Sequence, residues 1–404
     1  MRVAIVGAGI GGLTAAIALR RTGLDAHVYE QASILREVGA GIATSPNALK
    51  VLERLGLADT LREAAVISLS MDPRDWKTGE VLARVPLAEE AVRRWGAPFY
   101  HFHRADLHSI LRAAVGDQNI TLGARCISVE EDGSGATVHF ADGQRVTADL
   151  VVGADGVHSV VREYVAGADA PTWARQVSWR GLADGDVGRA IGLEVRHHSF
   201  WGPGKQFVCF YVSGGRQVNW VGNIETDDEW REESWSARGE RTEALRAFAG
   251  WHPQIEALIG ATPDIFKWAL FERSPLERWT RGRVTLLGDA AHPMLPFMAQ
   301  GGSQSIEDAW VLARCLADAP NEVGGALERY FALRHERAAA LQLTSSQMAS
   351  NVQLRDPDEV RARNARMKAA GAAYAERYDW IWGYDADAAL SSGGSGTPPL
   401  ATAR

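Results

Sequence analysis

Cysteine is scarce in this chain, and the three cysteines lie far apart in the sequence, at Cys126, Cys209 and Cys315. They form no CxxC pair, which argues against a zinc knuckle and against a disulfide between neighbouring cysteines, so no metal site is expected. Dense runs of Lys and Arg are also absent, and the formal net charge of −7 argues against nucleic-acid binding. The sequence shows neither a basic and apolar leader nor an apolar run long enough to cross a bilayer. These absences predict a cytoplasmic protein that acts on small molecules, without nucleic-acid or membrane partners.

The chain is long enough for more than one domain, with 404 residues of which 46% are apolar. This composition can bury a sizeable core, so two closely packed domains are the natural expectation. Apolar strands that alternate with helices predict an α/β fold.

The first thirty residues contain a complete fingerprint for an adenine dinucleotide. Residues 3–6 predict a buried parallel strand, and a glycine turn and a helix follow it. Gly7 permits the tight turn, Gly9 lets backbone amides approach a pyrophosphate, and Gly12 lets the helix pack on the sheet. The second strand ends at Glu30, where a carboxylate can accept hydrogen bonds from ribose hydroxyls.

Two later segments share the pattern of an apolar strand followed by an acid. Asp155 and Gly156 follow one strand, and Gly288 and Asp289 follow the other. Such a carboxylate can accept hydrogen bonds from ribityl or ribose hydroxyls, which offset the cost of its desolvation. A helix N-cap is the alternative for both acids, above all for Asp155.

The remaining pattern is that of helices and antiparallel strands. Helices are expected at 104–115 and from about 303 to 316, and a meander at about 120–147 with a turn at Asp142 and Gly143. Tryptophan is dense between about 173 and 271, where alternating stretches flank a turn at Gly214 and Gly215. That region predicts a sheet with one covered face.

Together these segments resemble the class A flavoprotein monooxygenases, the single-component FAD aromatic hydroxylases of the para-hydroxybenzoate hydroxylase superfamily. The resemblance covers residues 1 to about 385 and rests on GAGIGG at 7–12 with Glu30, the DG motif at 155–156, and the GD motif at 288–289 before Pro293. Within the superfamily, AGIATSPNALKVLERLGL and GDAAHPMLPFMAQGG look most like salicylate hydroxylases and 3-hydroxybenzoate 6-hydroxylases. The 6-hydroxynicotinate monooxygenases are similar as well.

The resemblance implies a Rossmann-like FAD-binding domain with an inserted substrate domain on a mixed β-sheet, followed by C-terminal helices. The FAD-binding domain is expected at 1–70, 100–172 and 275–320, and the substrate domain at 71–99 and 173–274. A helical region is expected at 321–388 and a disordered tail at 389–404. Family members are often dimers, which leaves a homodimer open for this chain.

The resemblance also implies which residues bind FAD. Glu30 would bind the adenosine ribose, and Arg104 would contact the dinucleotide. Asp155 would lie near FAD where NAD(P)H meets it, and Asp289 would bind the ribityl chain and the pyrophosphate. A second glycine fingerprint is absent, which matches the family habit of binding NADH or NADPH transiently. The full set of expected FAD-binding residues is Gly7, Gly9, Gly12, Glu30, Gln31, Arg36, Arg104, Asp155, Asp289, Pro293, Gly301 and Gly302.

Flavin hydroxylation requires a stabilised anionic reduced flavin and a flavin C4a-hydroperoxide that is protected from water. The helix near Ser303, with Gly301 and Gly302 at its start, is expected to direct its positive end at the flavin N1–C2 carbonyl region. The apolar loop at 294–298 is expected to exclude water, with ordinary core packing as the alternative.

Substrate activation should involve a base or proton relay, because a phenol is attacked fastest when it is deprotonated. A cation or hydrogen-bond donor should hold a carboxylate. The catalytic candidates are Arg180 and Tyr211, on strands expected to face the flavin, and Gln300. The substrate-binding candidates are Trp201, Pro296, Met298 and His103. A structural role is the alternative for each of them.

The predicted function is therefore NAD(P)H- and FAD-dependent hydroxylation of a small phenolic acid of the salicylate or 3-hydroxybenzoate type. The same chemistry on a hydroxynicotinate or on a larger secondary metabolite is an alternative. A flavin-loaded protein without catalytic turnover is a second alternative.

Overall fold

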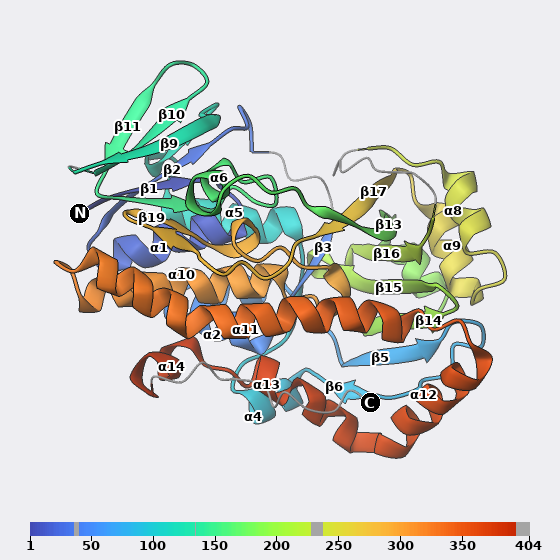
Figure 1. Ribbon diagram of the computed structural model, residues 1–404. Coiled ribbons are helices and arrows are strands. Elements are labelled where there is room, and N and C mark those ends of the chain that lie inside the picture. The colour runs from blue at the N-terminus through green and yellow to red at the C-terminus, as the bar shows by residue number, and fades with distance from the viewer. Residues whose placement is uncertain (36–39, 134, 228–236, 393–404) are drawn as a thin grey trace.

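Two large β-sheets and a set of long helices make up the computed structural model, which describes residues 1–35, 40–133, 135–227 and 237–392 (Figure 1). The α/β class predicted from the sequence is confirmed. One sheet is mostly parallel and contains the N-terminal strand, and the other is mixed and lies at the opposite end of the molecule (Figure 1). Arg36 and residues 393–404, for which FAD binding and disorder were expected, lie outside the described residues.

The first sheet has six strands in the order β18-β19-β12-β1-β2-β8. Its five inner and edge strands β19, β12, β1, β2 and β8 are parallel, and β18 is antiparallel. The strand bounds are Thr280–Arg281 (β18), Val284–Leu286 (β19), Leu150–Gly153 (β12), Arg2–Val6 (β1), Asp25–Glu30 (β2) and Ile120–Leu122 (β8).

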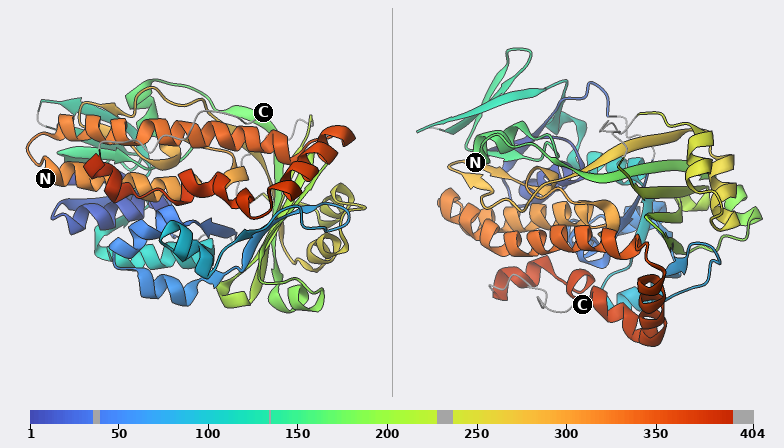
Figure 2. Two further views of the ribbon diagram at one scale, coloured as in Figure 1. Left: turned by 90° about the horizontal axis from the view of Figure 1, so that it is seen from below. Right: turned by 45° about the vertical axis from the view of Figure 1, so that its right-hand side comes forward.

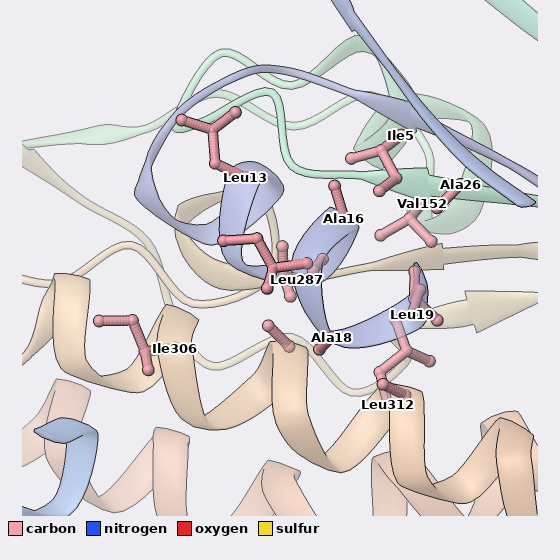
Figure 3. Packing of buried hydrophobic residues seen from close by; sticks show 14 of the residues in the cluster. Ile5, Leu13, Ala16, Ala18, Leu19, Ala26, Val152, Leu287, Ile306 and Leu312 are labelled. Carbon is pink, nitrogen blue, oxygen red and sulfur yellow. The ribbon is translucent and has the colours of Figure 1, made fainter. Parts of the chain in front are cut away.

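Helix α1 (Ile10–Arg21) packs between this sheet and α10 (Gly301–Asp318). Ala18 and Leu19 of α1 lie beside Leu312 of α10, and Ile5 and Val152 of the sheet lie above them (Figure 3). Full burial of a leucine such as Leu19 contributes about 1.5–3 kcal/mol, so the core fixes the helix that follows the glycine turn.

A three-stranded antiparallel sheet, β9 (Cys126–Asp132), β10 (Gly135–Phe140) and β11 (Arg145–Ala148), forms the later part of the predicted meander. Residues 120–122, where the meander was expected to begin, form β8 of the parallel sheet instead. Its turn contains Gly143 at a φ of +88°, a conformation that favours glycine. Helix α5 (Arg104–Val115) has the predicted bounds.

The second large sheet has seven strands in the order β17-β13-β16-β15-β14-β5-β6. It joins segments on either side of residue 100, because β5 pairs with β14. This pairing supports the expected division into domains, which stays a proposal. The bounds are Ile265–Glu272 (β17), Thr172–Asp184 (β13), Gln217–Glu225 (β16), Lys205–Val212 (β15), His197–Gly202 (β14), Ser70–Asp75 (β5) and Val85–Pro86 (β6).

Helices α8 (Arg241–Ala247) and α9 (Pro253–Ala261) cover the outer face of the seven-stranded sheet (Figure 2). A small sheet of β3 (Gly41–Thr44), β7 (Tyr100–His103) and β4 (Val66–Ile67) touches the inner face, where the Gly41 amide donates to Asn219 Oδ1 at 2.7 Å. The inner face is therefore the one turned toward the parallel sheet.

The C-terminal helices run along both sheets. Helix α11 (Val323–Val352) lies next to α10 at one end and reaches the seven-stranded sheet at the other (Figure 1). Helix α14 (Ala386–Ser392) continues into the expected tail, so the first four residues of 389–404 are helical. Within the described ranges, no helix is both long and apolar enough to span a membrane.

The other helices connect these layers. They are α2 (Pro46–Arg54), α3 (Ala58–Ala64), α4 (Glu89–Trp95), α6 (Val160–Ala166), α7 (Gly185–Ala190), α12 (Pro357–Ala370) and α13 (Asp379–Trp382), with short 3-10 turns η1 (Asp117–Asn119), η2 (Ser213–Gly215), η3 (Gly288–Ala290), η4 (Pro296–Met298) and η5 (Gly371–Tyr378).

Candidate active site

Four neighbouring parallel strands bring the sequence motifs to one edge of the six-stranded sheet. Asp289 follows β19, Asp155 follows β12, and the glycine turn follows β1. Glu30 is the last residue of β2. The carboxyl ends of parallel strands form the ligand crevice of open α/β sheets. The fold therefore assembles segments more than 250 residues apart in the sequence.

The glycine turn leaves room that side chains would fill. A Cβ atom on Gly7 would lie 2.4 Å from the Ala154 carbonyl oxygen, and one on Gly12 would lie 2.0 Å from the Gly7 carbonyl oxygen. A Cβ on Gly9 would meet nothing within 4 Å. Gly9 therefore faces open space at the N-terminus of α1, where the helix dipole favours a phosphate. This cradle fits the pyrophosphate of FAD.

Glu30 is held in place by two backbone amides. Its carboxylate oxygens accept hydrogen bonds from Ala8 N and Ala32 N, both at 2.8 Å. The side chain is half-buried and keeps lone pairs for further donors such as ribose hydroxyls. Gln31, beside it, is exposed.

Asp155 acts as a cap for helix α6. One carboxylate oxygen accepts from Ser159 Oγ at 2.5 Å, and the other accepts from Val160 N and Val161 N at 2.8 and 3.2 Å. Burial raises the pKa of Asp155, and these donors oppose the rise. The helix-cap alternative therefore describes its contacts, and a role toward FAD stays a prediction.

Asp289 lies on the 3-10 turn η3 at the edge of the sheet. Its side chain is accessible to solvent, but it lies in a deep recess with protein on its other sides. That surrounding protein raises the pKa of Asp289, and the charges of His292 and Arg104 oppose the rise. Arg104 is the first residue of α5, so two cofactor candidates from distant segments meet here. An accessible carboxylate at this depth suits the hydroxyls of a ribityl chain.

Helix α10 points its N-terminus at the same space. Gly301 and Gly302 open the helix, and among the described residues no side chain caps it. The nearest atom to a Cβ placed on Gly301 would be Asp289 Oδ1, at 3.7 Å. The free amides and the positive helix end suit the flavin carbonyl region.

Gln300 precedes this helix and turns its side chain inward. Its amide donates to Ser45 Oγ at 2.9 Å and accepts from Asn47 Nδ2 at 3.1 Å. Gln300 therefore ties the start of α10 to the start of α2, and the predicted catalytic contact stays a prediction.

Four charged side chains lie fully buried behind the first turns of α10; we call Glu307, Asp308, Arg334 and Arg337 the charged cluster. Arg334 donates to both acids, at 2.5 Å to Glu307 and 2.7 Å to Asp308. Arg337 donates to both oxygens of Glu307, at 2.9 and 3.0 Å. The two positive charges balance the two negative ones, which offsets the cost of burying them.

The charged cluster holds the cofactor loops. Asp308 Oδ2 accepts from the Gly288 amide at 3.0 Å and from His292 Nε2 at 2.5 Å, which fixes the turn that carries Asp289. Burial acts to raise the pKa of Asp308, but His292 and Arg334 lower it to about 2. Asp308 is therefore a permanent anion that orients this turn.

The inner face of the seven-stranded sheet lies across from this cradle. Side chains alternate between the two faces, and the cluster that packs on α8 and α9 contains Tyr211 and Trp220. Phe210 and Val221 therefore face inward. The structure corrects the expectation that Tyr211 faces the flavin, because its hydroxyl donates to the Leu193 carbonyl at 3.0 Å on the outer side.

One row of the inner face is left partly uncovered. Val208 and Val221 pair directly and are both partly exposed, whereas the residues two positions away on each strand are buried. Arg180 continues the row on β13 and Ser199 continues it on β14. We call Arg180, Val221, Val208 and Ser199 the pocket floor.

Arg180 is 1% exposed, and its guanidinium lies over the rings of Trp268 and Phe266, at 4.6 and 5.6 Å from their centroids. Among the four residues of the pocket floor, it is the one with a permanent positive charge. His197 also faces inward, but burial lowers its pKa to about 3, so it is neutral near pH 7.

The loop at 293–298 forms the wall beside the pocket floor. Phe297 packs with Trp268, and Met294 and Met298 pack with the cluster that contains Trp201. Pro293 is buried, and Pro296 is exposed. These contacts are those of core packing, which was the alternative, and a water-excluding role of the loop stays a prediction.

Two predicted substrate residues have structural contacts in this region. The ring of Trp201 lies under the Arg363 guanidinium at 5.2 Å, and its Nε1 donates to Ser199 Oγ at 2.7 Å. His103 Nδ1 accepts from Ala105 N at 3.2 Å and caps α5. Substrate contact by either residue stays a prediction.

Sequence reasoning missed the charged cluster and a row of neutral polar residues beside the pocket floor. Glu307 and Asp308 are adjacent acids between Ile306 and the apolar run at 309–313, and that signal could have marked a buried ionic contact. Ser199 and Gln206 carried no comparable signal.

The glycine cradle, the strand-end acids and the uncapped start of α10 together define a protein that binds a flavin dinucleotide at the edge of the parallel sheet. A family model described as "FAD binding domain" matches residues 1–345. A 3-amino-4-hydroxybenzoate 2-monooxygenase, PtmB3 of Streptomyces platensis, is 40% identical over 95% of this chain and 96% of its own. A 6-hydroxynicotinate 3-monooxygenase of Pseudomonas fluorescens is 38% identical over 95% of each chain. The crystal structure of Klebsiella pneumoniae HpxO with FAD and uric acid has a TM-score of 0.84, with 30% identity over 99% of this chain and 98% of that chain.

The chain belongs to this FAD-binding family and is an FAD-dependent aromatic monooxygenase. The resemblance drawn from the sequence is confirmed, and the alternative of a protein without catalytic turnover is set aside.

Proposed function

We propose that this monooxygenase hydroxylates a small aromatic acid with a ring hydroxyl, of the salicylate or 3-hydroxybenzoate type. One O2 and one NADH or NADPH are consumed; one oxygen atom enters the ring and the other leaves as water. Bound FAD supplies the electron transfer and the oxygen transfer. The names of the two relatives describe substrates with a hydroxyl and a carboxylate on one aromatic ring.

The pocket floor is the observation that carries this proposal. Val208 and Val221 offer a flat apolar surface to one face of a ring, while the cradle lies on the other side. Arg180 at one end would hold the carboxylate, because a buried guanidinium suits a carboxylate. The loop at 294–298 would keep water from the reacting ring.

On the cofactor side, the cradle would hold FAD through Glu30 at the ribose, Gly9 at the pyrophosphate and Asp289 at the ribityl chain. Gly301 and Gly302 would donate to the flavin carbonyl region. The open space at Gly9 and the uncapped start of α10 support this assignment.

The test is oxidation of NADH and of NADPH by the FAD-loaded protein, with salicylate, 3-hydroxybenzoate, 3-amino-4-hydroxybenzoate and 6-hydroxynicotinate offered separately. Peroxide is quantified and the product is identified by mass. We expect at least one acid to stimulate oxidation with little peroxide and to gain one oxygen atom. Stimulation by none of them would reject the proposed substrate class and favour a larger metabolite.

6-Hydroxynicotinate is the second candidate, because a relative named for that substrate is 38% identical. A cytoplasmic location and a homodimer stay proposals, and light scattering of the purified protein would test the latter.

A further inference from the structure

A chain of uncharged polar side chains crosses four strands beside the pocket floor. We call Ser178, Asn223, Gln206, Ser199 and Trp201 the neutral belt. Ser178 Oγ donates to Asn223 Oδ1, and Asn223 Nδ2 donates to Gln206 Oε1 at 3.1 Å. Gln206 Nε2 then donates to Ser199 Oγ at 3.1 Å. Every bond in the belt therefore runs toward Ser199.

Ser199 receives a second donor from the other side. Trp201 Nε1 donates to Ser199 Oγ at 2.7 Å, and an indole nitrogen can only donate. A hydroxyl has two lone pairs and one hydrogen, so both lone pairs of Ser199 are used. Its hydrogen donates to none of the described residues. The hydroxyl hydrogen is therefore left to point at an acceptor outside the described residues.

The position of Ser199 shows where that acceptor would lie. Ser199 pairs directly with Val208, the partly exposed residue at the centre of the pocket floor. A chain of hydrogen bonds that all run one way polarises its last member, which becomes a stronger donor. The acceptor is thus an oxygen at the edge of a ring that lies on Val208 and Val221.

Arg180 and Ser199 lie at opposite ends of the pocket floor, three strand spacings apart, or about 14 Å between backbones. The neutral belt carries no formal charge to pair with a carboxylate, so Ser199 suits the ring hydroxyl oxygen. This placement applies to substrates such as 3-hydroxybenzoate, because the hydroxyl and the carboxylate of salicylate lie on neighbouring ring carbons and would reach the same end of the pocket floor. A donor to the ring hydroxyl oxygen stabilises its deprotonated form more than its neutral form, which lowers the pKa of the bound phenol.

Resting on the proposed function, we propose that Ser199 binds the ring hydroxyl oxygen of the substrate as a hydrogen-bond donor and favours its phenolate form. Trp201 and Gln206 are positioning residues that turn the Ser199 hydroxyl toward the pocket. Ser178, at the other end of the neutral belt, has no contact with the substrate.

The experiment is a cycle between Ser199 and the ring hydroxyl, measured as dissociation constants by flavin absorbance titration of the FAD-loaded protein. The ligand pairs are 3-hydroxybenzoate against benzoate, and 3-amino-4-hydroxybenzoate against 3-aminobenzoate. In the wild type, removal of the ring hydroxyl should weaken binding about ten- to a hundredfold, as expected for a hydrogen bond to a charged group. In Ser199→Ala, its removal should change binding less than about threefold.

Two further variants control for damage to the fold. Ser199→Thr keeps the hydroxyl and should recover most of the coupling, whereas Ser178→Ala, at the far end of the belt, should lower the coupling far less than Ser199→Ala does. The absorbance pH titration of bound 3-hydroxybenzoate should show a higher phenol pKa in Ser199→Ala than in the wild type. FAD content and the unfolding midpoint confirm that each variant folds. The two ligands of a pair are always compared on the same variant, so a general loss of affinity in that variant cancels.

Equal losses in the wild type and in Ser199→Ala would overturn this inference while leaving the proposed function intact. Coupling that disappears in Ser178→Ala instead would show that the belt runs the other way, and would also overturn it. Wild-type protein that binds none of these acids would reject the proposed substrate class together with this inference.

Discussion

Two buried polar networks face each other across the candidate active site, and they are built from different chemistry. The charged cluster behind the flavin cradle uses two carboxylates and two guanidinium groups that are all fully buried. The neutral belt on the seven-stranded sheet uses hydroxyl, amide and indole groups. Buried charge is costly to disturb, so it suits the invariant task of fixing a cofactor loop. Neutral groups cost less to rearrange, so they suit a surface that meets the substrate.

The largest expected effect comes from breaking the charged cluster. Arg334→Ala leaves Glu307 and Asp308 buried with one guanidinium between them, so the free energy of unfolding should fall by about 3–5 kcal/mol. Urea unfolding measures it. Arg329, on the same helix as Arg334, forms a solvent-exposed ion pair with Asp318 of α10, and Arg329→Ala should cost about 1 kcal/mol or less. Similar losses in both variants would contradict the assigned role of the cluster.

As the pH falls, the seven-stranded sheet should lose stability at a higher pH than the cradle does. Burial lowers the pKa of His197 to about 3 and that of His198 to about 4, whereas unfolded histidine binds a proton below about pH 6.5. Between pH 6.5 and 4 the unfolded chain binds more protons, so the free energy of unfolding should fall as the pH falls. The loss should reach about 1.4 kcal/mol per pH unit for each histidine.

Asp308 responds in a lower range, because its pKa of about 2 lies below the unfolded value of 3.8 and its contribution is lost only below about pH 4. Urea titrations at pH 7, 5.5 and 4.5 measure the histidine range, and a titration at about pH 3 measures the range of Asp308. His197→Gln should flatten the slope above pH 4, and an unchanged slope would show that the sheet does not set it.

A charge placed in the neutral belt should affect substrate binding and leave FAD binding unchanged, which would separate the task of the belt from that of the charged cluster. Gln206→Glu offers Ser199 a carboxylate acceptor and places negative charge beside an anionic substrate. Binding of 3-hydroxybenzoate should weaken about tenfold or more, while FAD content stays at the wild-type level. Gln217→Glu, a partly exposed change at the start of β16, is the matched control. Loss of FAD from Gln206→Glu would mean that the belt also supports the cradle.

The smallest expected effect is at the DG motif. Ser159 Oγ accepts from Arg162 N at 2.8 Å and donates to Asp155, so Ser159→Ala should cost about 1 kcal/mol through the lost cap of α6. Thermal unfolding measures this loss. If Asp155 only caps the helix, the affinity for FAD should be unchanged; a weaker affinity would give Asp155 a role at the cofactor.

The cradle could be predicted from the sequence because its signals are local. A strand, a glycine turn, a helix and a terminal acid stand within thirty residues, and each has a spacing that the chemistry requires. The acids at 155 and 289 could be placed because the ends of parallel strands meet at one edge.

The substrate side could not be predicted in the same way. The stretch QFVCFYV is apolar on both faces, because the sheet is covered by helices outside and by the cradle inside. If the register of the strand is misjudged by one residue, every side chain is assigned to the wrong face. In the structure Tyr211 faces outward and its neighbour Phe210 faces inward. The proposed role of Ser199 depends on its hydrogen bonds with Gln206 and Trp201, and a single sequence does not reveal those contacts.

Helix α11 connects the charged cluster to the seven-stranded sheet. Arg334 and Arg337 on this helix anchor the charged cluster, and Gln353 at its C-terminal end exchanges hydrogen bonds with Gln176 on the inner face of the sheet, at 2.7 and 3.0 Å. The helix axis between Arg334 and Gln353 measures about 28 Å. Because this one helix contacts the cofactor loop through Arg334 and Asp308 and the seven-stranded sheet through Gln353, a movement of the helix along its axis would change the position of the sheet relative to the cradle.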